Sequence, residues 1–344
     1  MRVLVTGATG FLGRRLASAL VEHGHQVRVL VRNPSVDDAD IMNGAEIWRG
    51  DLSDPKTVIA ACADVEVVQH AGALSAPWGP KPEFYATNVG GTQAVIDGCQ
   101  RYGVRRLIYV SSPSVVFDGQ DQHNLTEAAP YPATSVSVYS HTKKLGEDLV
   151  NAASGDLEMV ILRPKAIFGP GDRALLPRLL ATARAGRLPM IGDGRNLVDL
   201  TYVDNVVEAM RLAMTADAAV GKTYHITNDE HPLLWNLVRR ILQELKLPPP
   251  RVRISLPAAL AAASAMEQVA RITGREPTLT RYSALILART QTYNIAAAKR
   301  DLSYTPPVSL EEGIERTLSA LRLEQLRQIT DDIRTAYKRA WARV

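Results

Sequence analysis

Near its amino terminus the chain reads Arg2-Val-Leu-Val-Thr-Gly-Ala-Thr-Gly-Phe-Leu-Gly13, an apolar run typical of a buried strand, then a glycine loop and a stretch with helical spacing. In such a unit Gly7 permits the tight turn, Gly10 lets backbone approach a pyrophosphate, and Gly13 lets the helix pack close to the sheet. The phosphates then meet free N–H groups at the positive end of the helix dipole. We therefore predict a dinucleotide-binding loop rather than a plain glycine turn. The expected contacts are Gly7, Thr9, Gly10, Phe11, Leu12 and Gly13.

Strand and helix patterns alternate through the first half of the chain. Runs typical of buried strands recur at Val27–Val31, Glu46–Arg49, Val65–His70, Arg106–Val110 and Met159–Leu162. Helical patterns lie among them, at Phe11–His23, Asp54–Ala63, Thr87–Tyr102 and Tyr139–Ala153. Repeated units of this kind predict an α/β fold, a Rossmann-type doubly wound parallel sheet with helices on both faces.

After Pro164 the chain becomes rich in proline and glycine and then mainly helical, which predicts a smaller helical substrate domain. We expect residues 1–167, with about 198–228, to form the NADP-binding Rossmann domain. Residues of about 168–197 and 229–320 then form the substrate-binding region, followed by a helical tail over 321–344. The two regions exchange segments of chain and so lie against each other. We expect the substrate to bind between them.

The composition describes a globular protein and excludes several classes. The 344 residues include 40 basic and 36 acidic side chains scattered along the chain, so no nucleic-acid partner is expected. Cys62 and Cys99 are the only cysteines and form no C-x-x-C pair, which argues against a disulfide framework or a zinc site. The uncharged stretch Ile254–Met266 is shorter than the roughly 20 residues of a membrane span. With no signal-peptide pattern at the start, the expected compartment is the cytoplasm.

The choice of cofactor depends on Arg32, which follows the second predicted strand where a carboxylate would accept hydrogen bonds from a ribose 2′-OH. A guanidinium there pairs with a 2′-phosphate and stacks on adenine. The sequence thus favours NADP(H), and NAD(H) remains the alternative if Arg32 is only solvated. We expect Asp51 to accept a hydrogen bond from the adenine amino group, with Leu52 beside it. The alternative for Asp51 is a turn or helix-initiating role.

Tyr139-Ser-His-Thr-Lys143 opens a predicted helix and places a phenol and an ammonium on one face. A phenol has a pKa near 10 and becomes an effective acid–base group where positive charge stabilises the phenolate. Lys143 and a nicotinamide cation would supply that charge. Ser112 ends the strand stretch Tyr109-Val-Ser-Ser112, where its hydroxyl would hydrogen-bond the substrate oxygen opposite Tyr139. The alternatives are a surface helix pair for Tyr139 and Lys143 and a turn cap for Ser112.

Further motifs recur in a fixed order: His70-Ala-Gly-Ala73, Asn88-Val-Gly-Gly-Thr92, Tyr109–Ser112, Arg163-Pro-Lys-Ala-Ile-Phe-Gly-Pro-Gly-Asp172 and Asp199-Leu-Thr-Tyr-Val-Asp-Asn205. Together with the glycine loop and Tyr139–Lys143 they resemble the extended short-chain dehydrogenases/reductases over nearly the whole chain. The resemblance implies a Rossmann sheet, a nicotinamide cofactor and a Ser/Thr–Tyr–Lys triad. By position the triad is Ser112, Tyr139 and Lys143. The resemblance also places Ala71, Gly72, Asn88 and Pro164 at the cofactor site.

The second half resembles the 3β-hydroxysteroid dehydrogenase-like branch of that family. Within the branch it is similar to the reductases of bacterial long-chain olefin biosynthesis, which reduce 2-alkyl-3-oxoalkanoates with NADPH. The strings that carry this similarity are Ser111–Phe117, Arg275–Pro277, Thr280–Tyr282, Ala288–Gln291 and Ala298–Pro306. Nucleotide-sugar epimerases usually carry Tyr-Gly after the catalytic strand, where this chain has Phe117-Asp118, and the departure counts against an epimerase.

The C-terminal half indicates an apolar substrate. Leu256–Met266 is small and apolar on almost every side, and Tyr282–Ala288 adds larger apolar residues, so these helices are buried or contact lipid or an apolar ligand. We expect a small hydrophobic keto or hydroxy substrate. The arginines that would instead hold a nucleotide sugar, or one carboxylate, are Arg173, Arg178, Arg195 and Arg281.

The tail has apolar residues at helical spacing, with basic residues around them. The apolar residues are Leu326, Ile329, Ile333, Tyr337, Ala340 and Val344. This pattern fits a peripheral membrane or lipid contact, a homodimer contact, or a helix packed on its own subunit.

Four functions fit these patterns. The leading one is an NADP(H)-dependent reductase that transfers hydride to the 3-keto group of a hydrophobic β-keto substrate, with Tyr139 as proton donor. A sterol or steroid 3β-dehydrogenase would use the same triad in the oxidative direction, and a nucleotide-sugar epimerase or reductase is the third. A non-catalytic NADP sensor or scaffold is the fourth, and the intact triad argues against it, because a sensor has no need of Tyr139 and Lys143.

Overall fold

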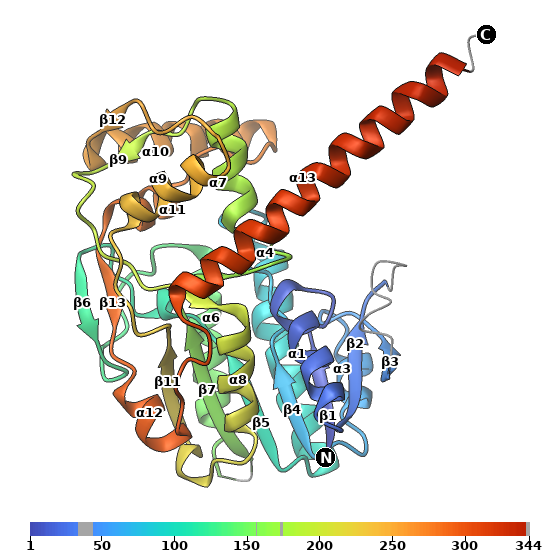
Figure 1. The fold of residues 1–344 in the computed structure, drawn as a ribbon. Helices are drawn as coiled ribbons and strands as arrows, with labels where there is room; N and C mark the ends of the chain where they lie inside the picture. Colours follow the sequence, from blue (N-terminus) through green and yellow to red (C-terminus); the bar gives the residue numbers. More distant parts are fainter. Residues whose placement is uncertain (34–43, 156, 173–174, 342–344) are drawn as a thin grey trace.

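A seven-stranded parallel sheet forms the centre of the computed structural model (Figure 1). The strand order is β11-β7-β5-β4-β1-β2-β3, and every neighbouring pair is parallel. The strands are β1 (Arg2–Thr6), β2 (Gln26–Val31), β3 (Ala45–Arg49), β4 (Val67–His70), β5 (Arg106–Val110), β7 (Glu158–Pro164) and β11 (Lys222–Ile226). The predicted Rossmann-type doubly wound sheet is confirmed.

The structure describes residues 1–33, 44–155, 157–172 and 175–341. Within its helices, the side chains of residues 175, 325–333 and 335–341 are not described. Arg173 and Val344 therefore lie outside the described residues, and the side chains of the other residues of the predicted tail stripe, from Leu326 to Ala340, are not described. The membrane or homodimer contact of the tail stays a prediction.

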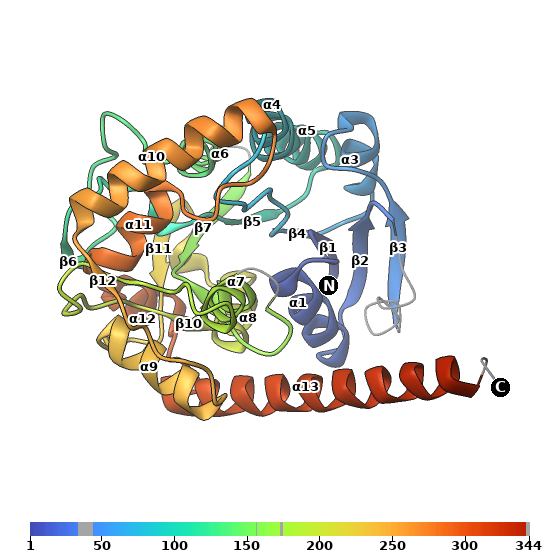
Figure 2. The same ribbon diagram turned by 90° about the horizontal axis from the view of Figure 1, so that it is seen from above.

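Helices cover both faces of the sheet (Figure 2). One face carries α3 (Pro55–Ala61), α5 (Gly91–Tyr102) and α6 (Val138–Ala152), and the other carries α1 (Phe11–Glu22) and α8 (Val203–Ala213). Successive side chains of β5 point to opposite faces of the sheet, because side chains alternate along a strand. Leu107 packs in the core under α3, α5 and α6, and Ile108 packs in the core under α1 and α8. The chain returns to the sheet late, where α12 (Ala296–Leu302) packs against β11.

A second layer, mainly helical, lies above the carboxyl ends of the strands (Figure 1). It contains α7 (Leu175–Arg184), α9 (Leu234–Glu244), α10 (Leu256–Thr273), α11 (Arg281–Ala288) and the start of α13 (Leu310–Trp341). Three short parallel pairs accompany this layer: β8 (Ile167–Phe168) with β10 (Thr201–Tyr202), β9 (Met190–Ile191) with β12 (Arg253–Ile254), and β6 (Gln122–Leu125) with β13 (Gln291–Tyr293). The β9–β12 pair lies within the helical layer, beside α10 (Figure 1). The helical character predicted for this half is confirmed.

The helix α10 is less buried than its apolar composition suggests. Ala259, Ala263 and Ala270 form its buried stripe, whereas Val269 and Ile272 are 58% and 86% exposed. Small side chains on one face let α10 approach α11 closely, and the opposite apolar face meets solvent. Among the described residues, no helix combines the length and the hydropathy needed to cross a membrane.

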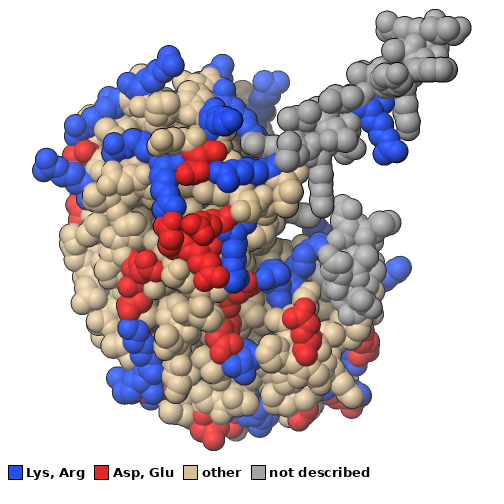
Figure 3. Space-filling view, in the orientation of Figure 1, with Lys and Arg blue, Asp and Glu red and all other residues tan. Residues whose placement is uncertain are grey.

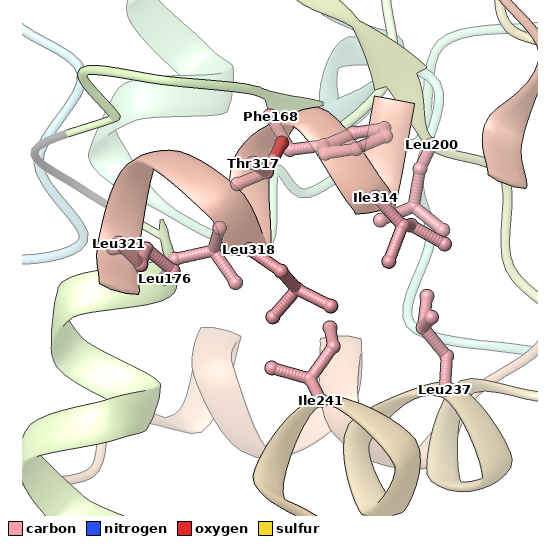
Figure 4. Close-up of a pocket in the computed structure, with 9 residues that line it drawn as sticks. All are labelled: Phe168, Leu176, Leu200, Leu237, Ile241, Ile314, Thr317, Leu318 and Leu321. Atoms are coloured by element: carbon pink, nitrogen blue, oxygen red, sulfur yellow. The ribbon is translucent and has the colours of Figure 1, made fainter. Parts of the chain in front are cut away.

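The first turns of α13 pack on α7 and α9, and both ribbon views show the rest of the helix extending beyond the body of the molecule (Figures 1 and 2). A cavity of about 30 Å³ remains under these turns (Figure 4). Its lining is Phe168, Leu176, Leu200, Leu237, Ile241, Ile314, Thr317, Leu318 and Leu321. The cavity holds little more than a water molecule and is too small for an organic substrate.

Basic and acidic side chains are interspersed on the face drawn in Figure 3. Many of them form surface ion pairs, for example Arg322 with Glu244 at 2.5 Å. This arrangement agrees with the scattered charge of the sequence.

The glycine loop is closely packed on its inner side. Gly7 adopts a φ of +73°, and a Cβ there would lie 2.6 Å from the Cα of Gly72 on the neighbouring strand end. A Cβ on Gly13 would lie 2.2 Å from the Gly7 carbonyl oxygen. Only glycine lets α1, β1 and the end of β4 meet at these distances.

We expect Gly13→Ala to lower the free energy of unfolding by about 1–3 kcal/mol, because the added methyl group meets backbone that cannot move aside. The matched control is Gly155→Ala, since a Cβ on Gly155 meets nothing within 4 Å. Denaturant titrations followed by circular dichroism measure both changes. Equal unfolding midpoints for the two variants would contradict the expected clash.

Candidate active site

The N-terminus of α1 is open toward a ligand. Gly10 is the N-cap residue, at φ −79° and ψ 169°, and no side chain caps the helix. The Gly10 N–H donates to the Gly7 carbonyl oxygen at 2.9 Å, and a Cβ on Gly10 would meet only that oxygen, at 3.1 Å. Free N–H groups at an uncapped helix start favour an anion. The residues present therefore fit the pyrophosphate of a dinucleotide.

Arg32 and Asp51 lie together at the ends of β2 and β3. The Arg32 side chain is 76% exposed, and its Nη1 lies 3.4 Å from Asp51 Oδ2. The other Asp51 oxygen accepts from the backbone N–H and the hydroxyl of Ser53, at 2.9 and 2.8 Å, and the backbone hydrogen bond lowers the Asp51 pKa. Leu52 packs on Gly72, where a Cβ would lie 2.5 Å from Leu52 Cδ1. These are the residues predicted at the adenine end.

His70 supports the floor of the glycine loop. Its Nδ1 lies 2.7 Å from Thr6 Oγ1, and its Nε2 lies 3.0 Å from Thr92 Oγ1. The Gly72 N–H donates to the same Thr6 hydroxyl at 3.1 Å. Burial lowers the pKa of His70 to about 3, so the imidazole is neutral. The ring therefore serves as a hydrogen-bonded link that orients Ala71 and Gly72.

Asn88 lies in a π-helical turn, Tyr85–Gly90, which includes the start of the α-helix predicted over Thr87–Tyr102. Its side-chain oxygen accepts from the Leu74 N–H at 2.7 Å, and its nitrogen donates to the Leu74 carbonyl at 3.1 Å. The same nitrogen donates to Thr142 Oγ1 at 3.0 Å. Asn88 thereby connects the loop after β4 to α6. Irregular turns of this kind often occur at functional sites.

The helix α6 carries Tyr139 and Lys143 in its first turns. Ser137 caps it in a reciprocal capping box: the Ser140 N–H donates to Ser137 Oγ at 3.0 Å, and the Ser137 N–H donates to Ser140 Oγ at 3.1 Å. The cap fixes where the helix begins. It thereby sets the direction in which Tyr139 leaves the helix.

Ser112 and Tyr139 meet at the carboxyl edge of the sheet. Ser112 follows β5, and its hydroxyl accepts from the Ser114 N–H at 3.2 Å. It lies close enough to the Tyr139 phenol to influence its pKa. Burial raises the pKa of the Tyr139 phenol, and the Ser112 hydroxyl partly offsets this rise. The direction is opposite to the lowering that we expected from Lys143. Tyr139 is therefore a protonated phenol, the form that donates a proton.

Lys143 lies over the ring of Tyr109. Its Nζ lies 4.0 Å from the centre of the Tyr109 ring, and burial lowers its pKa to about 7 while Glu147 opposes the shift. Tyr139, Lys143 and Glu147 follow one another at intervals of four residues on one helix face. Our sequence analysis did not include Glu147. The signal that identifies it is the continuation of that spacing by one more turn.

Glu147 forms a buried ion pair with Arg163 of β7. Arg163 Nε donates to one carboxylate oxygen at 2.8 Å, and Nη2 donates to the other at 2.6 Å. The Tyr131 hydroxyl also donates to Glu147 at 2.6 Å. Neither charged side chain is more than 3% exposed. The bidentate pair holds α6 against the strand that ends at Pro164.

Tyr282 of α11 is a further residue of the site that the sequence analysis did not assign. It lies close enough to Tyr139 for the two phenols to interact electrostatically. Burial raises the pKa of Tyr282. No short motif marks Tyr282, because it reaches Tyr139 only through the packing of α11 over the sheet edge.

Three of the four arginines considered for an anionic substrate are described, and all three are at the surface. Arg178 pairs with exposed Glu276 at 2.8 Å, and Arg195 and Arg281 are exposed. The described members of this set are therefore not buried side chains of the site.

Comparison with known proteins identifies the family. The model of the 3-beta hydroxysteroid dehydrogenase/isomerase family matches residues 4–258. The chain belongs to this family. It is an NAD(P)-dependent oxidoreductase of the extended short-chain type, as the motifs predicted.

Two relatives and one solved structure are informative. The chain is 40% identical over 332 residues to a 2-alkyl-3-oxoalkanoate reductase of Stenotrophomonas maltophilia, with 92% of this chain and 98% of that protein covered. It is 37% identical over 337 residues to a decarboxylating sterol-4-alpha-carboxylate 3-dehydrogenase of Saccharomyces cerevisiae, with 92% and 97% covered. Among solved structures, MoeE5 in complex with UDP-glucose and NAD has a TM-score of 0.75 at 26% identity, covering 94% of this chain and all of that one.

For this dehydrogenase we expect Glu147→Gln to lower the free energy of unfolding by about 3–5 kcal/mol, because it leaves the Arg163 charge buried without a counter-ion. The matched control is Asp148→Asn on the same helix, whose partner Lys144 is 31% exposed, and its cost is at most about 1 kcal/mol. Urea titrations of both variants measure the difference. Similar losses for the two would show that the buried pair does not anchor α6.

Proposed function

We propose that the protein is an NADP(H)-dependent reductase acting on the 3-keto group of a hydrophobic β-keto substrate similar to a 2-alkyl-3-oxoalkanoate. The observation that carries the proposal is the placement of the Tyr139 phenol beside Ser112 at the carboxyl edge of a parallel sheet with a glycine loop. The relative at 40% identity, a 2-alkyl-3-oxoalkanoate reductase, supports the substrate class.

A bound NADPH supplies the hydride. Ser112 and Tyr139 hold the keto oxygen between their hydroxyl groups, and Tyr139 Oη gives its proton to that oxygen as negative charge develops on it. Burial keeps the phenol protonated until then. Lys143, on the same helix face, contributes positive charge near the phenolate left behind. Asn88 and the Glu147–Arg163 pair keep α6 in place.

The helix α11 supplies an apolar wall for an alkyl chain. On this helix, Tyr282 is close enough to Tyr139 for an electrostatic interaction. The residues that follow it along the helix, Leu285, Ile286 and Leu287, are half-buried. Leu285 lies beside the loop at Gly119, where a Cβ would be 3.5 Å from Leu285 Cδ1. A chain leaving the keto carbon along α11 would replace water on these side chains. This agrees with the apolar substrate predicted from Ile254–Ala288.

A sterol or steroid 3β-dehydrogenase is the second candidate, because the yeast relative at 37% identity is a sterol-4-alpha-carboxylate 3-dehydrogenase. Both relatives' names describe compounds with a carboxylate on the carbon next to carbon 3. A nucleotide-sugar activity has less support. The structural likeness to MoeE5 reflects the shared scaffold, while Arg178, Arg195 and Arg281, which could hold a diphosphate, are exposed here.

The preference for NADP(H) is part of the proposal and depends on Arg32. We expect Arg32→Ala to weaken NADPH binding more than NADH binding by about 1.5–3 kcal/mol, the value of a hydrogen bond to a charged group. The exposed guanidinium has room to turn from Asp51 to a 2′-phosphate. Fluorescence titration with both cofactors gives the four dissociation constants. An equal loss for NADPH and NADH would show that Arg32 does not bind the 2′-phosphate.

Substrate class is tested by kcat/KM for β-keto acids of increasing chain length, measured with NADPH beside a 3-ketosteroid and UDP-galactose. Each buried CH₂ is worth about 0.8 kcal/mol, so we expect kcat/KM to rise roughly fourfold per carbon until the apolar wall is covered. Tyr139→Phe is the control: it should retain NADPH binding and lose about 10²–10⁴-fold in turnover.

A flat chain-length series, or turnover of the sugar nucleotide alone, would overturn the β-keto proposal. Turnover of the ketosteroid alone would favour the second candidate. Near-normal turnover by Tyr139→Phe would exclude Tyr139 as the proton donor.

A further inference from the structure

Lys165 leaves the sheet beside the reacting groups. In the parallel pair of β5 and β7, Val110 lies opposite Leu162, so Ser112 and Pro164 follow at the same edge. Lys165 is the next residue. It is buried, with 7% of its surface exposed. The end of β7 therefore brings an ammonium group to the edge at which Ser112 is placed.

The Lys165 side chain faces the loop that follows Ser112. Its Nζ donates to Gln291 Oε1 and lies 5.7 Å from the centre of the Tyr293 ring. Tyr293 packs on Val115 and Val116, which follow Ser112 by a few residues. Lys165 is thus separated from the loop of the triad serine by one aromatic ring.

The Lys165 ammonium and the polar groups near it have fewer hydrogen-bond partners than they could have. An ammonium has three N–H groups, and Gln291 is the one hydrogen-bond acceptor that Lys165 Nζ has among the described residues. Within the same described part of the chain, Gln291 Nε2, Tyr293 Oη and Ser114 Oγ are buried without a hydrogen-bond partner. Buried polar groups in this state favour a ligand that accepts hydrogen bonds.

Asp199 is close enough to stabilise the charge of Lys165 but does not bond to it. One Asp199 oxygen pairs with His231 Nδ1, and the other accepts from the Tyr293 N–H at 2.7 Å. Lys165 forms no ion pair with a carboxylate of the described residues. The ammonium therefore lacks a direct anionic partner.

We propose that Lys165, with the Gln291 amide beside it, binds the carboxylate of a β-keto or β-hydroxy acid substrate. The inference deepens the proposed function and rests on it. In such an acid the carboxylate lies two bonds from the carbonyl carbon. A carbonyl oxygen held by Ser112 and Tyr139 therefore places the carboxylate along the same sheet edge, where Lys165 lies.

The electrostatics of the position support this assignment. Burial lowers the pKa of Lys165 to about 8, and the side chain is still mainly cationic at neutral pH. A charge-assisted hydrogen bond is strong in a buried site. Arg178, Arg195 and Arg281, which were considered for a carboxylate from the sequence, are exposed and lack such a buried environment.

The test compares a long-chain 3-hydroxy acid with its methyl ester, each oxidised with NADP⁺. In Lys165→Met we expect the ratio of kcat/KM for acid over ester to fall about 10–100-fold. Gln291→Glu should lower the ratio similarly, because the introduced carboxylate forms an ion pair with the Lys165 ammonium and so competes with the carboxylate of the substrate. Lys144→Met is the matched control, since Lys144 pairs with Asp148 on the outer side of α6 at 2.6 Å, and its ratio should equal that of the wild type.

Calorimetric titration of acid and ester into the wild type and the three variants, with NADP⁺ present, measures the same preference without turnover. Loss of the acid preference in both site variants supports the assignment. An unchanged ratio, or an equal loss on acid and ester, overturns it. If the wild type oxidises neither compound, the proposed function fails, while the titrations still decide whether Lys165 binds a carboxylate.

Discussion

The buried ion pair between Glu147 and Arg163 positions the site. It joins the helix that carries Tyr139 and Lys143 to the strand that ends at Pro164, the residue before Lys165. A carboxylate and a guanidinium without solvent tolerate little displacement, because either charge left alone costs several kcal/mol. The bidentate geometry therefore fixes both the distance and the rotation of α6 relative to the sheet. Asn88 provides a second connection, from the opposite side, through Thr142.

The same exclusion of water gives neighbouring groups different protonation states. Burial raises the pKa of the Tyr139 phenol and lowers those of Lys143 to about 7 and Lys165 to about 8. It also lowers the pKa of His70 to about 3, so this imidazole works only as a hydrogen-bonded link. Desolvation penalises whichever form is charged, so acids and bases shift in opposite directions. Burial thus keeps the Tyr139 phenol protonated and brings the pKa of Lys143 close to neutral pH, while Lys165 stays mainly cationic.

The second, mainly helical layer covers the carboxyl edge of the sheet, where one fold can be adapted to different chemistry. MoeE5, whose structure contains UDP-glucose and NAD, shares the fold of this chain, and one fold can serve different functions through the sites built on it. Here that cover is α11, with Tyr282 toward the triad and apolar side chains beyond it. The neighbouring α10 shows that an apolar sequence is not by itself a buried one, because Val269 and Ile272 of its outer face meet solvent.

Local patterns in the sequence determined the sheet, the glycine loop, the helix of Tyr139 and Lys143, and the family. These features depend on residues within a few positions of one another, where periodicity and spacing are informative. The sequence also indicated Ser112 and Arg32, which follow strands whose ends meet at one edge. It did not reveal the partnership of Glu147 with Arg163, the approach of Tyr282 to Tyr139, or the contact of Lys165 with Gln291, 126 residues away. Such contacts have no local signature, since they form only when separate elements pack. The direction of the Tyr139 pKa shift was also decided by the tertiary structure, because the spacing to Lys143 shows a nearby charge but not how much water surrounds the phenol.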